Sequence, residues 1–487
     1  MICMNQTVQI VPYQDILKMK KQIIITIFIL LINLVFADIN SDLEYMQNIL
    51  QECYVNYDMN YKKGYKPELA KKTIKYYYKY AYKQNESIQD KKERESISLV
   101  DAISWGLEDT LLIPDGHLNI KYKDYAYPVF SLPRDYFTGV YIEEKEGKFF
   151  VYEDINGFVK KGLEYDDDSK YLRRCIHQNR EMYQIVIQAL EDITKIDLKF
   201  ENKKISLPCI CKDYNNNTDF INYKKTNKNF YVSIGFCPYL YDETSEYEQE
   251  IKNIVNEIDK YKQIDNFIID LRSNAGGFSC FEYLIPRLLC SSNEKQAFEK
   301  ILPLANRGKI ELISPDYLYN LAKYYEEAFP DNTYLIQKAK NEYIENRNNK
   351  KYYKGLAEYP INNLPPIKID RIKNNIIVLI DKKTASQAEY ALALLYLFGK
   401  EKIVLVGENS RGSLEVSNIL GYSLPDSKVK IFLGNTSTKN TSFMHCNNNW
   451  KGELIGFEPD YWAFSNEEII ETLIFLTNDK EIGKLGL

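Results

Sequence analysis

The alternation of apolar and polar residues is clearest in the second half of the chain. Short β-branched runs such as "NFYVSIGF", "NFIIDL", "IIVLID" and "KIVLVGE" recur there, each bounded by a polar or glycine-containing turn. Stretches with helical spacing, for example "SEYEQEIKNIVNEIDKY", separate these runs. Strands that alternate with helices predict an α/β core with a largely parallel sheet over residues 229–465.

The segments around this core have different patterns. Apolar residues at helical spacing predict a helical N-terminal subdomain over residues 38–124. Residues 125–228 alternate as strands do, but Met182–Ile193 is expected to be helical, so an α+β middle segment is predicted. Residues 294–363 predict a helical insertion, either a lid above a cleft or, as the composition favours, a solvated excursion. A C-terminal helix is expected over residues 466–487.

The start of the chain has the pattern of a secretory signal. From Met19, two lysines precede an apolar run from Ile23 to Phe36, and the small residue Ala37 follows. The run is shorter than the roughly 20 residues that span a bilayer. We therefore predict translation from Met19, a signal peptide within residues 1–37, and a periplasmic or secreted protein with no stable membrane insertion. An uncleaved N-terminal anchor is the alternative.

Composition narrows the possible partners. Lys and Arg number 63 against 68 Asp and Glu, a formal charge of -5, which argues against a nucleic-acid partner. Of the nine cysteines, the eight beyond Cys3 permit disulfides in an exported chain without requiring them. The three histidines are far apart in sequence and "PCIC" lacks the spacing of a zinc ribbon. No metal site and no cofactor are predicted.

Two turns at the ends of predicted strands carry candidate chemistry. In "FIIDLRSNAGGF" a strand ends before Gly276 and Gly277, which allow a close backbone approach and can direct N–H groups into a cleft. In "VLIDKKTASQAEYA" Ser386 falls at the start of a helix, where free N–H groups and the helix dipole favour a developing oxyanion. The alternative is that Thr384 or Ser386 only caps the helix and Glu389 completes the cap.

Several stretches, in this order, resemble one family. "DLRSNAGG", "VLIDKKTASQAEYA", "VLVGENSRG", "YSLPDSKVKIFLGN" and "GFEPD", with an upstream "IPDGH", are similar to the carboxyl-terminal processing (tail-specific) and tricorn-type serine peptidases. The resemblance covers about residues 229–462, interrupted by the insertion. It implies a crotonase-like or ClpP-like core and the hydrolysis of peptide bonds in unfolded or carboxyl-terminal polypeptide segments.

The resemblance also implies the roles of individual residues around the scissile bond. The nucleophile of the family's Thr-Ala-Ser-x-x-Glu turn corresponds to Ser386. The oxyanion hole corresponds to the N–H of Gln387 together with that of Gly276 or Gly277.

The general base is expected to be a histidine. The processing branch uses a lysine after a glycine, but here Ser413 follows Gly412, so a Ser-Lys dyad is not expected. The tricorn-like branch uses a histidine, which corresponds to His117, and imidazole accepts a proton near neutral pH. In that branch a glutamate, matched here by Glu453, supports the base through a preceding serine, whose place is taken by Gly116.

The sequence therefore predicts an exported serine peptidase of the tricorn-like, Ser-His branch, which needs no cofactor and acts on a polypeptide substrate. Asp115, Arg411 and Glu458 are alternative polar partners for His117. The rival hypothesis is a catalytically decayed peptidase-fold protein that binds peptides or apolar ligands. Gly116 and the missing lysine favour the rival. No oligomeric state is predicted.

Overall fold

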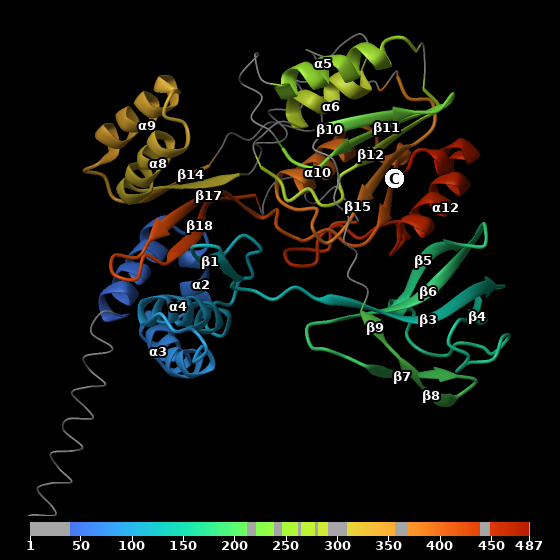
Figure 1. The fold of residues 1–487 in the computed structure, drawn as a ribbon, viewed down its shortest axis with the longest axis horizontal. Coiled ribbons are helices and arrows are strands. Elements are labelled where there is room, and N and C mark those ends of the chain that lie inside the picture. The colour runs from blue at the N-terminus through green and yellow to red at the C-terminus, as the bar shows by residue number, and fades with distance from the viewer. Residues whose placement is uncertain are drawn as a thin grey trace, which may run out of the picture.

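A computed structural model gives the fold. Its helices and strands form three groups (Figure 1). The structure describes residues 39–211, 221–237, 246–261, 264–277, 281–290, 309–355, 369, 371–438 and 449–486. The predicted signal peptide region, residues 1–37, lies outside the described residues, as do residues 294–308 and 356–363 of the predicted insertion.

The first group is built on a six-stranded sheet with the order β10-β11-β12-β15-β16-β19. Strands β11, β12, β15, β16 and β19 are parallel to one another, and the edge strand β10 is antiparallel to β11. The strands are β10 (Ile221–Lys225), β11 (Asn229–Ile234), β12 (Asn266–Asp270), β15 (Ile376–Ile380), β16 (Ile403–Gly407) and β19 (Tyr461–Trp462). The predicted α/β core with a largely parallel sheet is confirmed.

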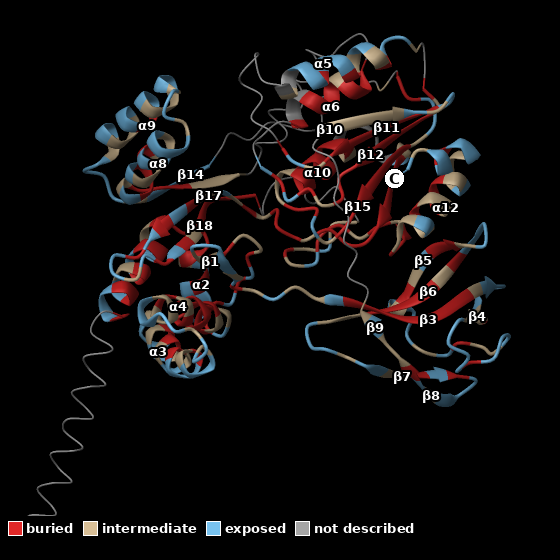
Figure 2. Ribbon diagram, viewed as in Figure 1, coloured by how far each residue is buried: buried red, intermediate tan, exposed pale blue. Residues whose placement is uncertain are grey.

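Helices cover both faces of this sheet, which explains why its central strands are apolar throughout. Ile376, Val378 and Ile380 face one hydrophobic cluster, whereas Ile377 and Leu379 face another. Figure 2 shows that these central strands are buried along their length. The helices are α5 (Glu246–Ile258), α6 (Phe281–Leu289) and α10 (Gln387–Gly399) on the first face and α12 (Asn466–Thr477) on the second.

The second group packs the N-terminal helices against an antiparallel sheet with the order β14-β13-β18-β1-β2, in which β17 also pairs with β18. The helices are residues 39–53, α2 (Tyr57–Lys63), α3 (Pro67–Gln84), α4 (Lys91–Glu108), α8 (Pro315–Ala328) and α9 (Thr333–Asn346). The strands are β1 (Asn119–Tyr122), β2 (Tyr125–Pro128), β13 (Ile310–Ile313), β14 (Tyr352–Gly355), β17 (Val416–Ser423) and β18 (Lys430–Ser437). The described part of the insertion thus contains two strands beside its helices.

The third group is a β-rich unit below the parallel sheet in Figure 1. Its strands are β3 (Arg134–Lys145), β4 (Lys148–Asp154), β5 (Leu172–His177), β6 (Arg180–Ala189), β7 (Lys195–Phe200), β8 (Lys203–Pro208) and β9 (Ile210–Cys211). A short 3₁₀ helix, η1 (Ser169–Tyr171), occurs in this unit; two others are η3 (Lys400–Lys402), between α10 and β16, and η4 (Lys480–Lys484), near the C-terminus.

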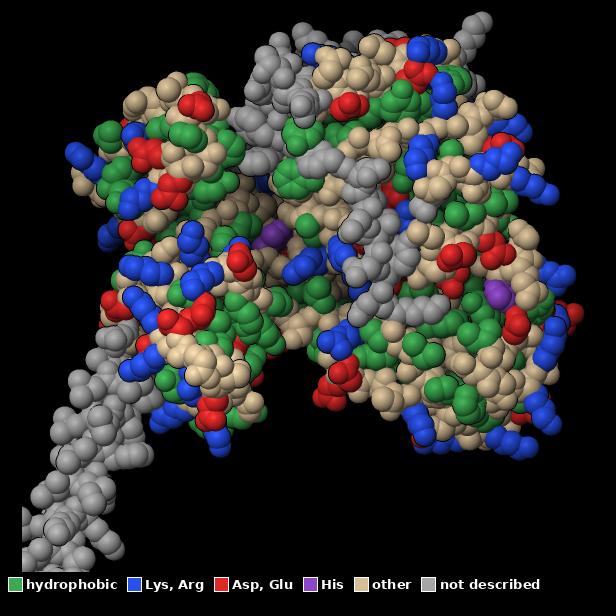
Figure 3. All heavy atoms as spheres, in the orientation of Figure 1, with side chains coloured by type: hydrophobic (Ala, Val, Ile, Leu, Met, Phe, Trp, Pro, Cys, Tyr) green, Lys and Arg blue, Asp and Glu red, His purple; other side chains and the backbone are tan. Residues whose placement is uncertain are grey.

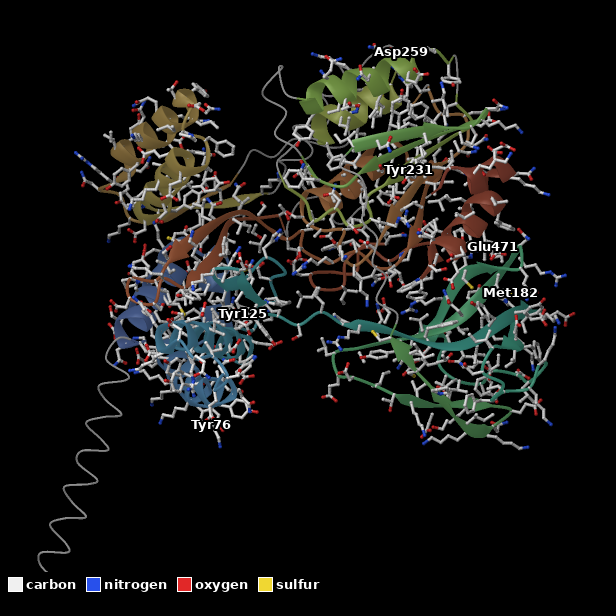
Figure 4. The ribbon with its side chains drawn as sticks, in the orientation of Figure 1. Tyr76, Tyr125, Met182, Tyr231, Asp259 and Glu471 are labelled. Atoms are coloured by element: carbon white, nitrogen blue, oxygen red, sulfur yellow. The ribbon has the colours of Figure 1, made fainter. Side chains whose placement is uncertain are left out.

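The helix predicted over Met182–Ile193 is wrong, because most of this stretch is strand β6, paired with β3 and β5. Residues 184–187 are buried in succession, and such an unbroken run does not distinguish a strand from a buried helix. His177 ends strand β5, and its ring stacks on Tyr141. Figure 4 shows Met182 and Glu471 where this unit meets α12.

Two further findings concern the predicted compartment. Within the described residues, no helix is long and apolar enough to cross a membrane. Cys53, Cys175, Cys209 and Cys237 form no disulfide with another described residue, whereas Cys280 and Cys446 lie outside the described residues.

Candidate active site

Three turns that carry candidate residues lie at one edge of the parallel sheet. Strands β12, β15 and β16 are neighbours and run in the same direction, so their carboxyl ends share an edge. The turns that follow them, residues 271–277, 381–386 and 407–415, therefore lie side by side. This edge is where open α/β sheets place their ligands.

Buried polar contacts hold the first of these turns. Asp270 and Arg272 form an ion pair whose side chains are almost completely buried. The hydroxyl of Tyr231, labelled on β11 in Figure 4, donates to Asp270 at 2.7 Å. Asp381 then joins this turn to the next one, because its carboxylate accepts from the N–H groups of Ser273 and Thr384 at 2.9–3.0 Å.

Ser386 sits in a strained conformation directly before α10. Its φ is +55°, a left-handed value that is uncommon for a residue other than glycine and often marks a functional position. Gly276 packs against it, since an added Cβ at Gly276 would lie 2.7 Å from the Cβ of Ser386 and 2.9 Å from the nitrogen of Gln387. The structure therefore brings Ser386, Gln387 and Gly276 together, and the close approach requires glycine at position 276.

The two glycines differ as possible oxyanion donors. The N–H of Gly276 donates to Asn274 Oδ1 at 2.8 Å, so it is already used. Within the described residues the N–H of Gly277 has no such acceptor, and the φ of Gly277 is +139°. Of the two alternatives left by the sequence, Gly277 is the one whose donor is available.

Glu389 connects the nucleophile's turn to the loop after β16. Its side chain is fully buried and accepts four hydrogen bonds, from Ser386 N at 3.2 Å, Ser410 Oγ at 2.5 Å, Gly412 N at 2.6 Å and Ser413 N at 2.7 Å. Burial raises the pKa of this carboxyl, and the four donors oppose that rise. The sequence predicts Glu389 only as part of a helix cap. Its contacts with residues 410–413 were not predicted.

His117 lies in a cluster with two carboxyl groups, on the segment just before β1. One donor atom each from Asp115, His117 and Glu453 lie within 4.8 Å of one another. Glu453 accepts from the N–H groups of Gly116 and Glu415 at 2.9 Å each, which ties this segment to the loop after β16. Glu453 therefore lies close to His117, and glycine at position 116 places no side chain between them.

A hydroxyl from another segment fills the space beside Gly116. A Cβ built at Gly116 would overlap Ser413 Oγ and would lie 2.7 Å from the carbonyl oxygen of Gly412. Ser413 Oγ is buried and has no hydrogen-bond partner within the described residues. The resemblance implies a serine at position 116. In the structure the side chain of Ser413, from the loop after β16, occupies the space that a side chain at position 116 would fill.

The electrostatic environment keeps His117 neutral. Burial lowers the pKa of its imidazole to about 4, and the positive charge of Arg411 adds to the effect. Burial raises the pKa of Asp115 and that of Glu453, and the neighbouring Asp115 raises the pKa of Glu453 further. Neither ring nitrogen of His117 has a hydrogen-bond partner within the described part of the chain.

The same cluster has the donor types of a cation site. One imidazole and two carboxylates are ligands that a divalent metal such as Zn²⁺ accepts. The spacing of these residues along the chain did not indicate a metal site, because spacing does not reveal that residues 115–117 and 453 meet in space. The same three groups can equally orient a general base.

Comparisons with known proteins were then made. No protein-family model and no curated protein matches the sequence. Among solved structures, the chain is similar to mature CPAF (12% identity, TM-score 0.41, 92% of this chain and 99% of that chain covered). It is also similar to the photosystem II D1 C-terminal processing protease (11%, 0.32, 87% and 92%) and to the tricorn protease (11%, 0.27, 85% and 36%). These values do not assign a function, which must be argued from the site.

Proposed function

We propose that the protein is a serine peptidase that hydrolyses peptide bonds in unfolded or carboxyl-terminal polypeptide segments by a Ser-His mechanism after export. One observation carries the proposal. Ser386 is held in a left-handed conformation at the N-terminus of α10, against a glycine turn that leaves the N–H of Gly277 available. A strained serine beside backbone donors is the arrangement that acyl transfer requires.

The proposed chemistry has two halves. Ser386 Oγ attacks the scissile carbonyl carbon while its proton passes to His117, and the oxyanion is held by the N–H groups of Gly277 and Gln387. The C–N bond then breaks, and His117 gives its proton to the leaving amine. Water repeats the sequence on the acyl ester and frees Ser386. Asp115 and Glu453 would stabilise the imidazolium formed in each half.

A peptide-binding protein without activity is the second candidate. Within the described residues Ser386 Oγ and His117 share no hydrogen bond, an arrangement that a decayed site would also have. Such bonds are often long in unliganded enzymes and shorten only with substrate. A chemical test is therefore needed to separate the two candidates.

The test is covalent labelling of purified mature protein, starting at Asp38, with a fluorophosphonate probe. Ser386→Ala and His117→Ala should both abolish labelling. Ser273→Ala is a matched control, because Ser273 also has a left-handed φ, +61°, on the adjoining turn, and should label as wild type does. Circular dichroism would establish that each variant is folded. Absence of labelling in folded wild-type protein would favour the binding protein.

A further inference from the structure

Arg411 is a partly buried cation beside the candidate site. Its backbone N–H donates to the carbonyl of Thr384 at 2.9 Å, two residues before Ser386. Its positive charge also reaches His117, whose pKa it lowers. The backbone of Arg411 is therefore held beside the turn that carries the proposed nucleophile, and its charge acts on the proposed base.

No side chain within the described residues compensates this charge by an ion pair or a hydrogen bond. Glu389 is the carboxylate that stabilises the charged form of Arg411, but its oxygens already accept the four hydrogen bonds given above. Burial alone lowers the pKa of Arg411, since removing a cation from water is costly unless an anion compensates it. Such a cation is able to bind an anion that a substrate brings.

Arg411 lines a small pocket beside these turns. The other lining groups that matter are Lys382 and Asn409, with apolar walls from Leu132, Leu454 and Ile455. Lys382 lies 3.2 Å from the buried carboxylate of Asp135, so its charge is compensated. Asn409 Oδ1 is buried and accepts no hydrogen bond within the described part of the chain, so it offers an acceptor to an incoming N–H. Figure 3 shows Lys and Arg side chains around the hollow between the group that carries β1 and the group that carries α10.

We propose that Arg411 is a carboxylate-binding subsite next to Ser386, which selects polypeptides that carry a carboxylate close to the scissile bond. The planar fork of arginine matches a carboxylate with two parallel hydrogen bonds, and the apolar walls strengthen the interaction. The carboxylate comes either from the chain terminus or from an Asp or Glu side chain. The position of the subsite relative to the cleaved bond rests on the proposed function.

The first experiment measures binding without turnover, in the Ser386→Ala protein. Fluorescence anisotropy would follow four pools of fluorescein-labelled decapeptides, made with a free terminus or as amides, and with or without Asp and Glu. Peptides with a carboxylate should bind about 10- to 100-fold more tightly than fully amidated peptides that lack Asp and Glu. The pool that retains the preference identifies the source of the carboxylate.

Substitutions of Arg411 test whether its side chain causes the preference for carboxylate-bearing peptides. Arg411→Met should abolish it, and Arg411→Lys, which keeps the charge but loses the fork, should retain a smaller part. Lys383→Met is the matched control, because it removes one exposed positive charge three residues before Ser386 and should keep the full preference. Equal binding of all pools, no measurable binding, or a preference that survives in folded Arg411→Met protein would overturn the inference.

The second experiment measures cleavage of the same pools by wild-type protein, with products identified by mass spectrometry. Arg411→Met should reduce the ratio of kcat/KM for carboxylate-bearing peptides to kcat/KM for amidated peptides by about 10- to 100-fold. Labelling by fluorophosphonate without any carboxylate preference would refute the subsite alone. A carboxylate preference in binding, without labelling or cleavage, would refute the proposed peptidase and leave the subsite standing.

Discussion

Replacing Glu389 by glutamine tests whether this buried carboxylate organises the site. An amide has one acceptor oxygen, so its NH₂ group must face one of the two donor pairs. If it faces Ser386 N and Ser413 N, both N–H groups lose their acceptor. If it faces Ser410 Oγ and Gly412 N, the hydroxyl can turn and accept, and only the N–H of Gly412 is left without a partner. The second arrangement costs less and is the one expected.

The size of the effect follows from this arrangement. One buried N–H without a partner costs about 1–3 kcal/mol, and the three remaining hydrogen bonds lose the strength that a charged acceptor gives. The loss of a desolvated charge returns part of that free energy. We expect Glu389→Gln to lower the free energy of unfolding by about 2–4 kcal/mol and to slow fluorophosphonate labelling, because the loop at residues 410–413 is no longer held to Ser386.

Urea denaturation followed by circular dichroism measures the first effect, and the labelling rate well below the urea midpoint measures the second. Glu401→Gln is the matched control, because Glu401 is exposed and the same change there should alter stability by less than about 0.5 kcal/mol. A Glu389→Gln protein with the midpoint and labelling rate of wild type would show that the four hydrogen bonds do not organise the site.

Four further predictions follow from other features. The labelling rate should stay near its neutral-pH value down to about pH 5 and then fall, because only neutral imidazole accepts a proton and the pKa of His117 is lowered to about 4; a midpoint near 6.5 would contradict this. Gly116→Ser should lower the free energy of unfolding by about 1–3 kcal/mol and slow labelling, because the new side chain overlaps Ser413 Oγ, and adding Ser413→Gly should recover part of both losses; no recovery would contradict the overlap. Dialysis against EDTA should leave labelling unchanged, whereas a loss that Zn²⁺ restores would make the cluster around His117 a metal centre. Iodoacetamide should spare Cys53 in the folded protein at mildly alkaline pH and modify it in urea, as mass spectrometry can show, because burial raises the pKa of its thiol to about 12.

Sequence patterns predicted those features that depend on neighbours along the chain. The β-branched runs of β12 and β15 and the turns after them are local, so the α/β core and the placing of Ser386 beside Gly276 could be expected from motifs alone. Strand β6 was not predicted from its pattern. Its residues are buried on both faces, so the period of two that marks a strand is absent.

Features that depend on distant segments could not be predicted in this way. Nothing in "IPDGH" shows that Ser413 occupies the space beside Gly116, since the two positions are brought together only by the packing of the loop after β16. The same holds for Arg411, which forms no ion pair with a described residue because Glu389 already accepts hydrogen bonds from other donors. A motif gives residue types, whereas these properties come from hydrogen bonds between segments.

The pairing of β1 with β18 has a consequence for biosynthesis. His117 precedes β1, and apart from the hairpin with β2 the partner of β1 is β18, with Asn119 opposite Phe432. A ribosome therefore delivers the histidine more than three hundred residues before the strand that fixes its place, and Glu453 emerges later still. The candidate site is therefore among the last parts of the molecule to assemble, and the nascent chain is largely synthesised before that site is complete.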